Sequence, residues 1–360
     1  MLKVFLSPFA KCFQDQRQSN KGSILILTLL VLAVLSVLSL NLGFVVRQKL
    51  NFLKHVETND KLHFIAEAGV KKAILELKKE HIASKDSCHL NESWSNNSLA
   101  FKEVRLGDGV FTVGYIINNN SRVDNSEDGS EELMQYGLID ENSKINLNTA
   151  DTAVFKRLFQ DVVFLSEELA EELAYCVIDW RDADSNFQHP SYGAEDSYYR
   201  NLKEPYEAKD SDYEVLEELL LVREMDEEIF DKIENYVTVY GSGKININTA
   251  SSEVLSALGL TDGLIEKIMS FRHGMDLEFA SFDDNFFASG SSIISELKSF
   301  VSLNQSEIMQ LELMIAEGKL GVTSENFMVK STAKLDKIDD HYQIIAVVDC
   351  EGKIKYWQED

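Results

Sequence analysis

One long apolar run near the N-terminus dominates the hydrophobic pattern of this 360-residue chain. Residues Ile24 to Val46 contain no charged side chain, and about 20 apolar residues are enough for a helix to cross the hydrocarbon core of a membrane. The leader before this run carries four basic residues and one acidic residue. Because a positively charged flank stays in the cytoplasm, we expect a single-pass protein whose C-terminal bulk lies on the outer side.

The helical pattern continues beyond the apolar run. From Phe52 to Leu77, apolar residues recur at helical spacing among lysines and glutamates, which is typical of a helix with one buried face. We therefore expect one helix over residues 23–80. Its membrane part would be residues 24–46, and its second half would pack against a globular head.

Two other regions have the residues of β-strands. Residues 107–118 predict a strand, in a hairpin with residues 100–106, and residues 327–360 predict three strands separated by turns. The polar stretch 118–132 predicts an exposed loop. Between these β regions, residues 148–321 have a largely helical pattern.

This order of elements predicts an α+β fold. A long N-terminal transmembrane helix would be followed by an α/β head, built from residues 81–147 and 322–360. A large helical domain, residues 148–321, would be inserted between strands of that head. The sequence thus predicts two folded regions behind one membrane anchor.

The helical middle contains an internal repeat. The segments Lys144–Ala150 (KINLNTA) and Lys244–Ala250 (KININTA) differ at one position and begin 100 residues apart. An amphipathic segment follows each copy, at Asp151–Phe159 and at Ser251–Leu258. The repeat predicts a strand that turns into a helix, twice, with Asn and Thr side chains capping the first N–H groups of each helix.

Charge and cysteine content narrow the compatible partners. The formal net charge is −25, from 60 acidic and 35 basic residues, and such a field repels nucleic acid and anionic lipid but favours divalent cations or basic partners. The four cysteines, Cys12, Cys88, Cys176 and Cys350, form no C-x-x-C pair, so zinc-site spacing is absent. A disulfide through Cys88 or Cys350 is compatible with an extracytoplasmic compartment, and the sequence leaves its pairing open.

The junction between the leader and the apolar run is a candidate cleavage site. A secretory signal peptide has a shorter apolar region that ends in a small-residue site, whereas here Lys21-Gly22-Ser23 precedes the run. Cleavage between Gly22 and Ser23 would remove the leader and keep the helix, which resembles the prepilin-peptidase leader of type IV pilins and pseudopilins. An uncleaved signal anchor has the same pattern and remains an alternative.

One departure from the pilin pattern is informative. Most pilins carry Glu at the fifth position of the mature chain, where this sequence has Leu27. A carboxylate in lipid is costly without a partner, and in pilins that partner is taken to be the N-terminal amine of a neighbouring subunit. A subunit that lacks the Glu is suited to a special position, such as the end of a fibre.

An acidic segment in the helical middle is a candidate calcium loop. Asp182, Asp184 and Asn186 alternate as calcium ligands often do. The EF-hand register fails, because Phe187 stands where that loop needs glycine. The segment therefore predicts a calcium loop of another kind.

A solvated loop in an acidic protein is the alternative interpretation of this segment. Asp179 would then lie on the preceding helix, where it would cap that helix or pair with Arg181 or Arg223. The sequence does not separate the two interpretations.

Four motifs in and after this segment carry the strongest resemblance to a known family. They are D-W-x-D-A-D at Asp179–Asp184, G-A-E-D-x-Y-Y at Gly193–Tyr199, and the longer segments Tyr213–Met225 and Tyr236–Ala250. With the leader, the apolar helix, both repeats and the C-terminal strands, they resemble the general secretion pathway protein K family, minor pseudopilins of the type II secretion system. The resemblance covers nearly the whole chain, apart from Cys88–Ser98 and Ser281–Gly290.

The resemblance implies a pilin-like head with an inserted helical domain of the SAM-like or helix-hairpin-helix-like kind. It implies an inner-membrane protein with its bulk in the periplasm, which moves to the pseudopilus tip and helps to start fibre assembly and protein export. The implied partners are the I and J minor pseudopilins, with the H type as a further candidate, the major pseudopilin and the prepilin peptidase, and no nucleic acid.

The resemblance also implies a structural calcium ion in the helical domain. The candidate ligands are Asp182, Asp184, Glu195 and Asp196. The stretch Ser185–His189 is longer and less acidic than the family pattern leads us to expect. This departure affects the choice of individual ligands more than the existence of the site.

Two other functions fit parts of the sequence. The I-N-[LI]-N-T-A pattern resembles the opening of helix-hairpin-helix modules in membrane-anchored DNA-uptake receptors, but the turn Leu258–Gly263 has no G-x-G and carries Asp262 where a phosphate would bind. A minor pilin of a type IV pilus would share the leader and the head. No H-E-x-x-H, nucleophile-elbow or P-loop pattern occurs, so we expect no enzymatic activity.

Overall fold

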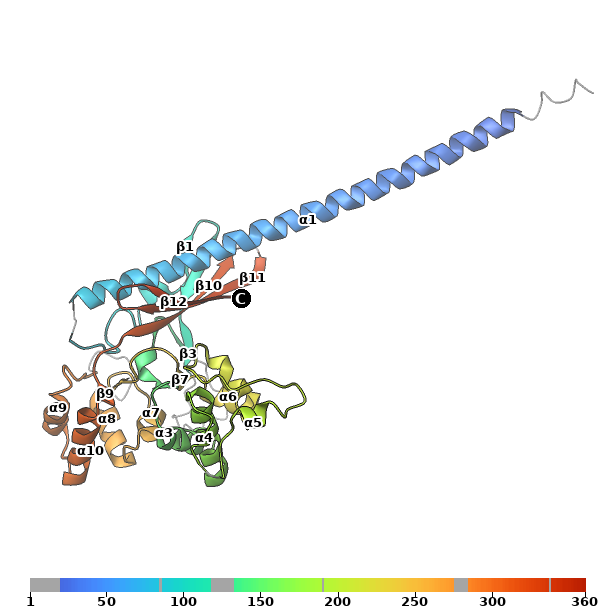
Figure 1. Cartoon of the computed structure of the whole chain (residues 1–360). Coiled ribbons are helices and arrows are strands. Elements are labelled where there is room, and N and C mark those ends of the chain that lie inside the picture. Colours follow the sequence, from blue (N-terminus) through green and yellow to red (C-terminus); the bar gives the residue numbers. More distant parts are fainter. Residues whose placement is uncertain (1–19, 84–85, 118–132, 190, 275–283, 337) are drawn as a thin grey trace, which may run out of the picture. The chain divides into compact units, whose positions relative to one another are not determined.

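A computed structural model describes most of the chain (Figure 1). The described residues are 20–83, 86–117, 133–189, 191–274, 284–336 and 338–360. The leader as far as residue 19 and the loop predicted at 118–132 lie outside them. The chain divides into two compact units, Met1–Lys61 and Leu62–Asp360.

Helix α1 runs from Asn20 to Ala83, in agreement with the single long helix predicted from the sequence. The bond between Gly22 and Ser23 lies in its first turn. Among the described residues it is the one helix long and apolar enough to cross a membrane, and its most apolar stretch has no buried residue. A helix that is apolar on all sides and unburied within its own chain needs a lipid or protein environment.

The second unit contains a six-stranded antiparallel sheet in the order β1-β2-β10-β11-β12, with β5 also paired to β10. The strands are β1 (Val104–Leu106), β2 (Gly109–Val113), β5 (Ile139–Asp140), β10 (Asn326–Leu335), β11 (Ile338–Asp349) and β12 (Ile354–Glu359). The predicted hairpin and the three C-terminal strands are confirmed. The strand predicted over 107–118 is interrupted at Gly114, after which β3 (Tyr115–Ile117) pairs with β4 (Leu133–Gln135) instead.

Helix α1 packs on this sheet from Leu62 onward (Figure 1). Its buried residues recur at helical spacing and are Leu62, Ala66, Val70, Ala73 and Leu77. The closest approach is at Gly69, where a Cβ atom would lie 2.1 Å from the Ser331 Oγ atom of β10. That hydroxyl donates to the Ala66 carbonyl at 2.8 Å, so a glycine allows the helix to lie directly on the strand.

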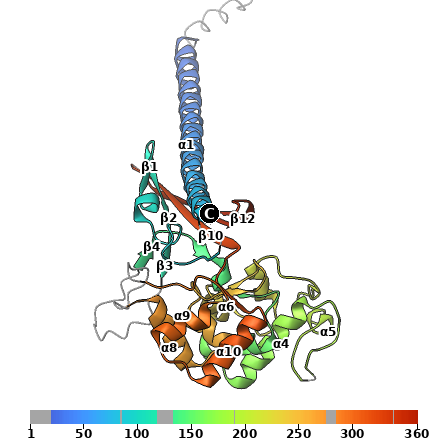
Figure 2. The same cartoon turned by 90° about the vertical axis from the view of Figure 1, so that its left-hand side faces the viewer.

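The helical domain lies in the chain between β5 and β10. Its helices are α3 (Thr152–Asp161), α4 (Glu167–Arg181), α5 (Asp196–Tyr199), α6 (Glu227–Ile233), α7 (Ser252–Ala257), α8 (Asp262–Arg272), α9 (Ile293–Phe300) and α10 (Gln305–Ala316). The short helix α2 (Ser98–Phe101) belongs to the head, and 3-10 turns occupy Glu141–Ser143 and Leu216–Leu221. Figure 2 shows α8 and α9 on one side of the domain and α4 and α5 on the other.

The helical domain contains two short parallel strand pairs, one for each copy of the repeat. Strand β6 (Ile145–Asn146) pairs with β7 (Val237–Thr238), and β8 (Ile245–Asn246) pairs with β9 (Leu320–Gly321). Each half therefore begins with one copy of the repeat and ends with the strand that pairs with it. The strand-to-helix transition predicted for each copy is confirmed.

The capping residues differ from those predicted. The N-cap of α3 is Asp151, whose side chain accepts from the Val154 N–H at 2.9 Å, and the N-cap of α7 is Ser251, which accepts from the Val254 N–H at 3.3 Å. The prediction that Asn and Thr side chains cap these helices is therefore wrong by position. A short side-chain oxygen still makes the cap, but one residue after the repeat.

The second asparagine of each repeat instead forms hydrogen bonds with the backbone of a residue far along the chain. The Asn148 side chain accepts from the Tyr213 N–H at 2.7 Å and donates to the Tyr213 carbonyl at 3.0 Å. In the second copy, Asn248 makes the same two bonds to Phe287, at 2.8 and 3.0 Å. An amide side chain can satisfy both groups of one peptide residue at once, so each copy ties a later segment of its own half to the strand.

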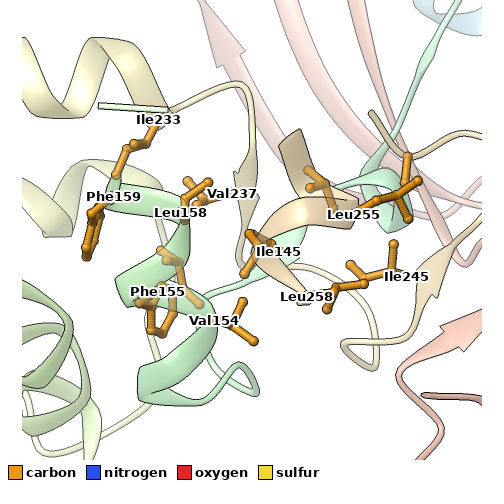
Figure 3. Packing of buried hydrophobic residues seen from close by; sticks show 14 of the residues in the cluster. Ile145, Val154, Phe155, Leu158, Phe159, Ile233, Val237, Ile245, Leu255 and Leu258 are labelled. Carbon is orange, nitrogen blue, oxygen red and sulfur yellow. The ribbon is translucent and has the colours of Figure 1, made fainter. Parts of the chain in front are cut away.

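The two halves share one hydrophobic core. Figure 3 shows side chains of α3 and of α7 with its C-cap Leu258 gathered around Ile145 of the first repeat. Phe155, Leu158 and Leu255 are each 0% exposed. Duplication of the repeat therefore places two amphipathic helices against each other, and their joint burial stabilises the domain.

Candidate metal centre

Three carboxylates converge where α4 ends. Asp179 lies in the last turn of α4, Asp182 is its C-cap, and Glu195 is the N-cap of α5. One oxygen from each lies within 4.8 Å of the other two. The loop between the two helices therefore folds back on the helix that precedes it and brings together acids 16 positions apart in the sequence.

These carboxylates are buried and incompletely satisfied. Asp179 is 0% and Glu195 2% exposed. Both carboxylate oxygens of Glu195 and the Oδ1 atom of Asp182 have no hydrogen-bond partner among the described residues. Unpaired buried polar atoms are costly, so the site has unused acceptors aimed at a common point.

Burial and mutual repulsion raise the pKa values of two members of the group. Burial, followed by the charge of Asp179, raises the pKa of Glu195 to about 8. Burial also raises the pKa of Asp179 to about 6, although two backbone N–H groups act in the opposite direction. A positive ion at this point would remove the cause of both shifts, because it would favour the charged carboxylates.

Asp179 is held by the loop itself. Its carboxylate accepts from the Gln188 N–H at 3.2 Å and from the Ala194 N–H at 3.1 Å. Gly193 has a φ of +104°, and a Cβ there would lie 2.0 Å from the Asp179 Oδ2 atom. Only glycine tolerates this conformation and this approach, which explains the glycine in the G-A-E-D motif.

The structure unites two of the four predicted ligands. Asp182 and Glu195 belong to the group, whereas Asp184 is exposed and accepts from the backbone and side chain of Asn186. Asp196 forms an ion pair with Arg200 at 2.7 Å and accepts from the Ala208 N–H at 2.9 Å. In this structure, Asp184 and Asp196 therefore lie outside the three-carboxylate group.

The sequence interpretation missed Asp179 as a ligand. The described contacts do not pair it with either arginine considered: Arg181 donates to the carbonyls of Leu147 and Ala150, and Arg223 pairs with Glu172 at 2.6 Å. Its spacing from Asp182 was an available signal, because residues three apart lie on the same side of a helix end.

The donor set fits a hard divalent cation. Calcium takes about six to eight oxygen ligands, commonly from carboxylates, backbone carbonyls and water. Three carboxylates supply the charge and part of the oxygen count, and no His or Cys joins the group. The chemistry of the site favours calcium over zinc.

Comparison with known proteins agrees with the motifs around this site. Residues 131–242, which include the three carboxylates, match the family model described as type II secretion system protein K. These residues are therefore similar to the protein K family. The predicted resemblance to this family is thereby confirmed, and its model describes a component of a secretion system.

The fold of this chain also resembles a solved structure. A chain of the crystal structure of the GspK–GspI–GspJ complex from the enterotoxigenic Escherichia coli type 2 secretion system matches with a TM-score of 0.58 and 16% identity. The match covers 87% of this chain and 98% of that chain. The predicted α+β fold is confirmed, and no curated protein matches this chain in sequence.

Proposed function

We propose that this protein is the minor pseudopilin at the tip of a type II secretion pseudopilus, where it helps to start fibre assembly and export across the outer membrane. The observation that carries the proposal is the match of residues 131–242 to protein K. The apolar helix α1 supports anchoring in the inner membrane before assembly. The hydrophobic Leu27 at the fifth mature position supports a terminal place in the fibre, since no carboxylate there requires a neighbour's amine.

The proposed partners follow from the similarity of this chain to protein K. The solved relative is a GspK–GspI–GspJ complex, and we propose that this chain assembles with minor pseudopilins of the I and J types. The major pseudopilin would follow below them in the fibre. The prepilin peptidase would act first, at the bond between Gly22 and Ser23, and expose a new N-terminus at the start of the apolar helix.

The N-terminal mass of the membrane-extracted chain tests this proposal. We expect a chain that starts at Ser23 when it is co-expressed with a prepilin peptidase, and a chain that keeps its leader when the peptidase is absent. A Gly22→Leu variant should keep the leader in both cases. An intact leader on the unaltered chain in the presence of active peptidase would contradict assembly as a pseudopilin.

We propose that a structural calcium ion occupies the centre formed by Asp179, Asp182 and Glu195. Calcium would supply positive charge that neutralises the carboxylates and fixes the loop between α4 and α5. The support is the convergence of one oxygen from each carboxylate, together with the missing hydrogen-bond partners of both Glu195 oxygens and of the Asp182 Oδ1 atom. The predicted ligands Asp184 and Asp196 would contribute at most to the outer charge of the site, because each is engaged elsewhere in the loop.

A further inference from the structure

Two cysteines from distant parts of the chain meet at the linker that leaves the helical domain. Residues 322–325 connect β9 to β10. The Cys88 N–H donates to the Val322 carbonyl at 2.7 Å, and the Cys350 N–H donates to the Glu325 carbonyl at 3.3 Å. The segment that follows α1 and the turn that follows β11 are therefore both bonded to this linker.

The two cysteines lie beside neighbouring residues of this linker. The Cys350 Sγ atom donates to the Ser324 carbonyl at 3.0 Å, two residues after the Val322 carbonyl that accepts from the Cys88 N–H. After burial, the charge of an ionised Cys350 is a further cause of the raised pKa of the Cys88 thiol, in keeping with two sulfur atoms near each other. Both cysteines are free in the structure and half-buried.

The Cys88 thiol also contacts the Glu92 carboxylate; burial raises the pKa of Glu92, and this contact acts in the opposite direction with a smaller effect. Neither thiol takes part in a metal site of the described residues. The carboxylate group described above is the one candidate metal cluster among the described residues, and it contains no cysteine. The third described cysteine, Cys176, is buried within the core of the helical domain. The Cys88 carbonyl accepts from the side chains of Asn246 and Asn248, at 3.1 and 3.2 Å, so the backbone at Cys88 is already a fixed attachment point for the second repeat.

We propose that Cys88 and Cys350 form a disulfide bond in the exported protein, which fastens the segment after α1 to the β11–β12 turn across the linker. The inference rests on the proposed function, because it needs the head to lie outside the cytoplasm, where protein thiols are oxidised. The bond would close a loop that contains the whole helical domain. It would thereby fix both ends of the linker through which that domain joins the head.

The chemistry requires a protein disulfide as the oxidant. One thiolate attacks a sulfur of the oxidant's disulfide, and the oxidant's other sulfur leaves as a thiolate. The second thiolate then attacks the mixed disulfide and releases the oxidant as a dithiol. The two cysteines lose two electrons and two protons, and the oxidant gains the two electrons and the two protons.

Burial makes this step dependent on a catalyst. Burial raises the pKa of Cys350 to about 11 and that of Cys88 further still. Few molecules of either thiol are then ionised at neutral pH. Spontaneous oxidation would be slow, and the bond would form during folding, while the segments are accessible to an oxidising partner of the thiol–disulfide exchange class.

Thiol mapping of the full chain in its own membranes tests the proposal. Free thiols are blocked with a maleimide in acid-quenched cells, and the protein is then denatured, reduced and labelled with a second reagent. We expect the second label on Cys88 and Cys350 and not on Cys176. A non-reducing digest should yield one cross-linked peptide pair that is two hydrogens lighter than its separate peptides. Maleimide on both cysteines before reduction would overturn the proposal.

A separate reporter distinguishes failure of the disulfide from failure of export. Leu99 is 96% exposed, so a Leu99→Cys variant should react with a membrane-impermeant maleimide in spheroplasts if the head is exported. Labelled reporter with reduced Cys88 and Cys350 would overturn the disulfide and leave the proposed function intact. Unlabelled reporter in intact spheroplasts, with labelling after lysis, would overturn export and the disulfide together.

Single and double variants separate a covalent role from packing. In the oxidised chain, reductant should lower the thermal midpoint by roughly 5 °C or more, because the bond restricts the unfolded chain. Cys88→Ser, Cys350→Ser and the double variant should share one midpoint that reductant does not change. Losses that add in the double variant, or a wild-type midpoint insensitive to reductant, would contradict the bond.

Discussion

At the scale of single residues, this protein places acids in two different buried environments. Asp179, Asp182 and Glu195 face one another with unused oxygens. Asp140 is also buried, but its carboxylate accepts from Ser324 Oγ at 2.6 Å and from three further donors. The first arrangement would be satisfied by the proposed cation, whereas the second is satisfied by the chain itself.

The calcium centre predicts opposite effects of one substitution with and without the ion. In chelator near neutral pH, the raised pKa of about 8 leaves most of Glu195 protonated, so the neutral Glu195→Gln variant should unfold at the same temperature as wild type or slightly higher. With calcium at about 100 times its Kd, wild type should gain about 2.7 kcal/mol, and the variant should gain much less. Thermal unfolding with calcium and with chelator measures both.

The matched control for this substitution is Asp184→Asn. Asp184 is an acid of the same loop that lies outside the three-carboxylate group. It should keep the calcium-dependent gain. Equal stabilisation of wild type and Glu195→Gln by calcium would contradict the assigned ligands.

Asp140 predicts a dependence of stability on pH. Burial raises its pKa above 3.8 in the folded chain, so folding favours the protonated acid. The folded chain therefore loses stability, relative to an Asp140→Asn variant, as pH rises from about 4 through the raised pKa. The loss is at most about 1.4 kcal/mol per pH unit.

Urea unfolding of wild type and Asp140→Asn at a series of pH values measures this difference. The exposed Asp86 provides a control substitution of the same kind, Asp86→Asn, which is followed over the same pH series. A constant difference for Asp140→Asn across the series would show that Asp140 does not titrate with folding.

At the scale of elements, the duplicated strand-to-helix unit organises the helical domain. Each copy supplies a strand for a parallel pair, a helix for the shared core and an asparagine that holds a later segment. The surroundings of the two copies still differ. Lys144 is 6% exposed and paired with Glu141 at 2.7 Å, whereas Lys244 of the second copy is exposed.

The side chains of Asn148 and Asn248, which hydrogen-bond to the backbone of Tyr213 and Phe287, predict a matched pair of destabilising substitutions. Asn148→Ala and Asn248→Ala each remove two hydrogen bonds to the backbone of one residue, and Asn248→Ala also removes the bond to the Cys88 carbonyl. Each should lower the free energy of unfolding by about 1–3 kcal/mol, because the backbone groups left behind are unsatisfied. Denaturant unfolding measures the loss.

The control for these two substitutions is an exposed asparagine whose side chain makes one hydrogen bond to the backbone. Asn91 donates to the Asp284 carbonyl at 2.9 Å in an exposed position. Asn91→Ala should change stability by less than about 0.5 kcal/mol. Losses as small as this for Asn148→Ala and Asn248→Ala would mean that the repeat contributes only its strand and helix.

At the scale of the whole molecule, one strongly acidic chain combines an apolar helix with a folded head and an inserted helical domain. The net charge of −25 suits partners that are basic or bridged by cations and opposes nucleic acid. The helical domain is inserted between β5 and β10 and is joined to the head through residues near Asp140 and Ser324. The anchor, head and insertion correspond to the parts expected of a terminal pseudopilin.

A terminal position in the fibre predicts how the membrane helix responds to an acid. If no subunit lies beyond this one, Leu27→Glu gains no neighbouring amine and should be as harmful as Leu30→Glu one turn further along. Both should reduce recovery of the chain with the other minor pseudopilins, because an unpaired carboxylate is costly in lipid. Co-purification from membranes measures recovery. Selective tolerance of Glu at position 27 would indicate an amine partner and an internal position.

The sequence by itself determined the features that depend on local periodicity and composition. The apolar run, the continuous helix, the C-terminal strands and the two strand-to-helix repeats follow from residues close together in the chain, whose side-chain spacing alone selects helix or strand. The family motifs also located the acidic loop. Only the tertiary structure decided which acids of that loop converge, which distant backbone the repeat asparagines bind, and that Cys88 and Cys350 lie beside the same linker. Those outcomes depend on contacts between segments up to 262 residues apart, and they are set by how buried surfaces pack rather than by any local pattern.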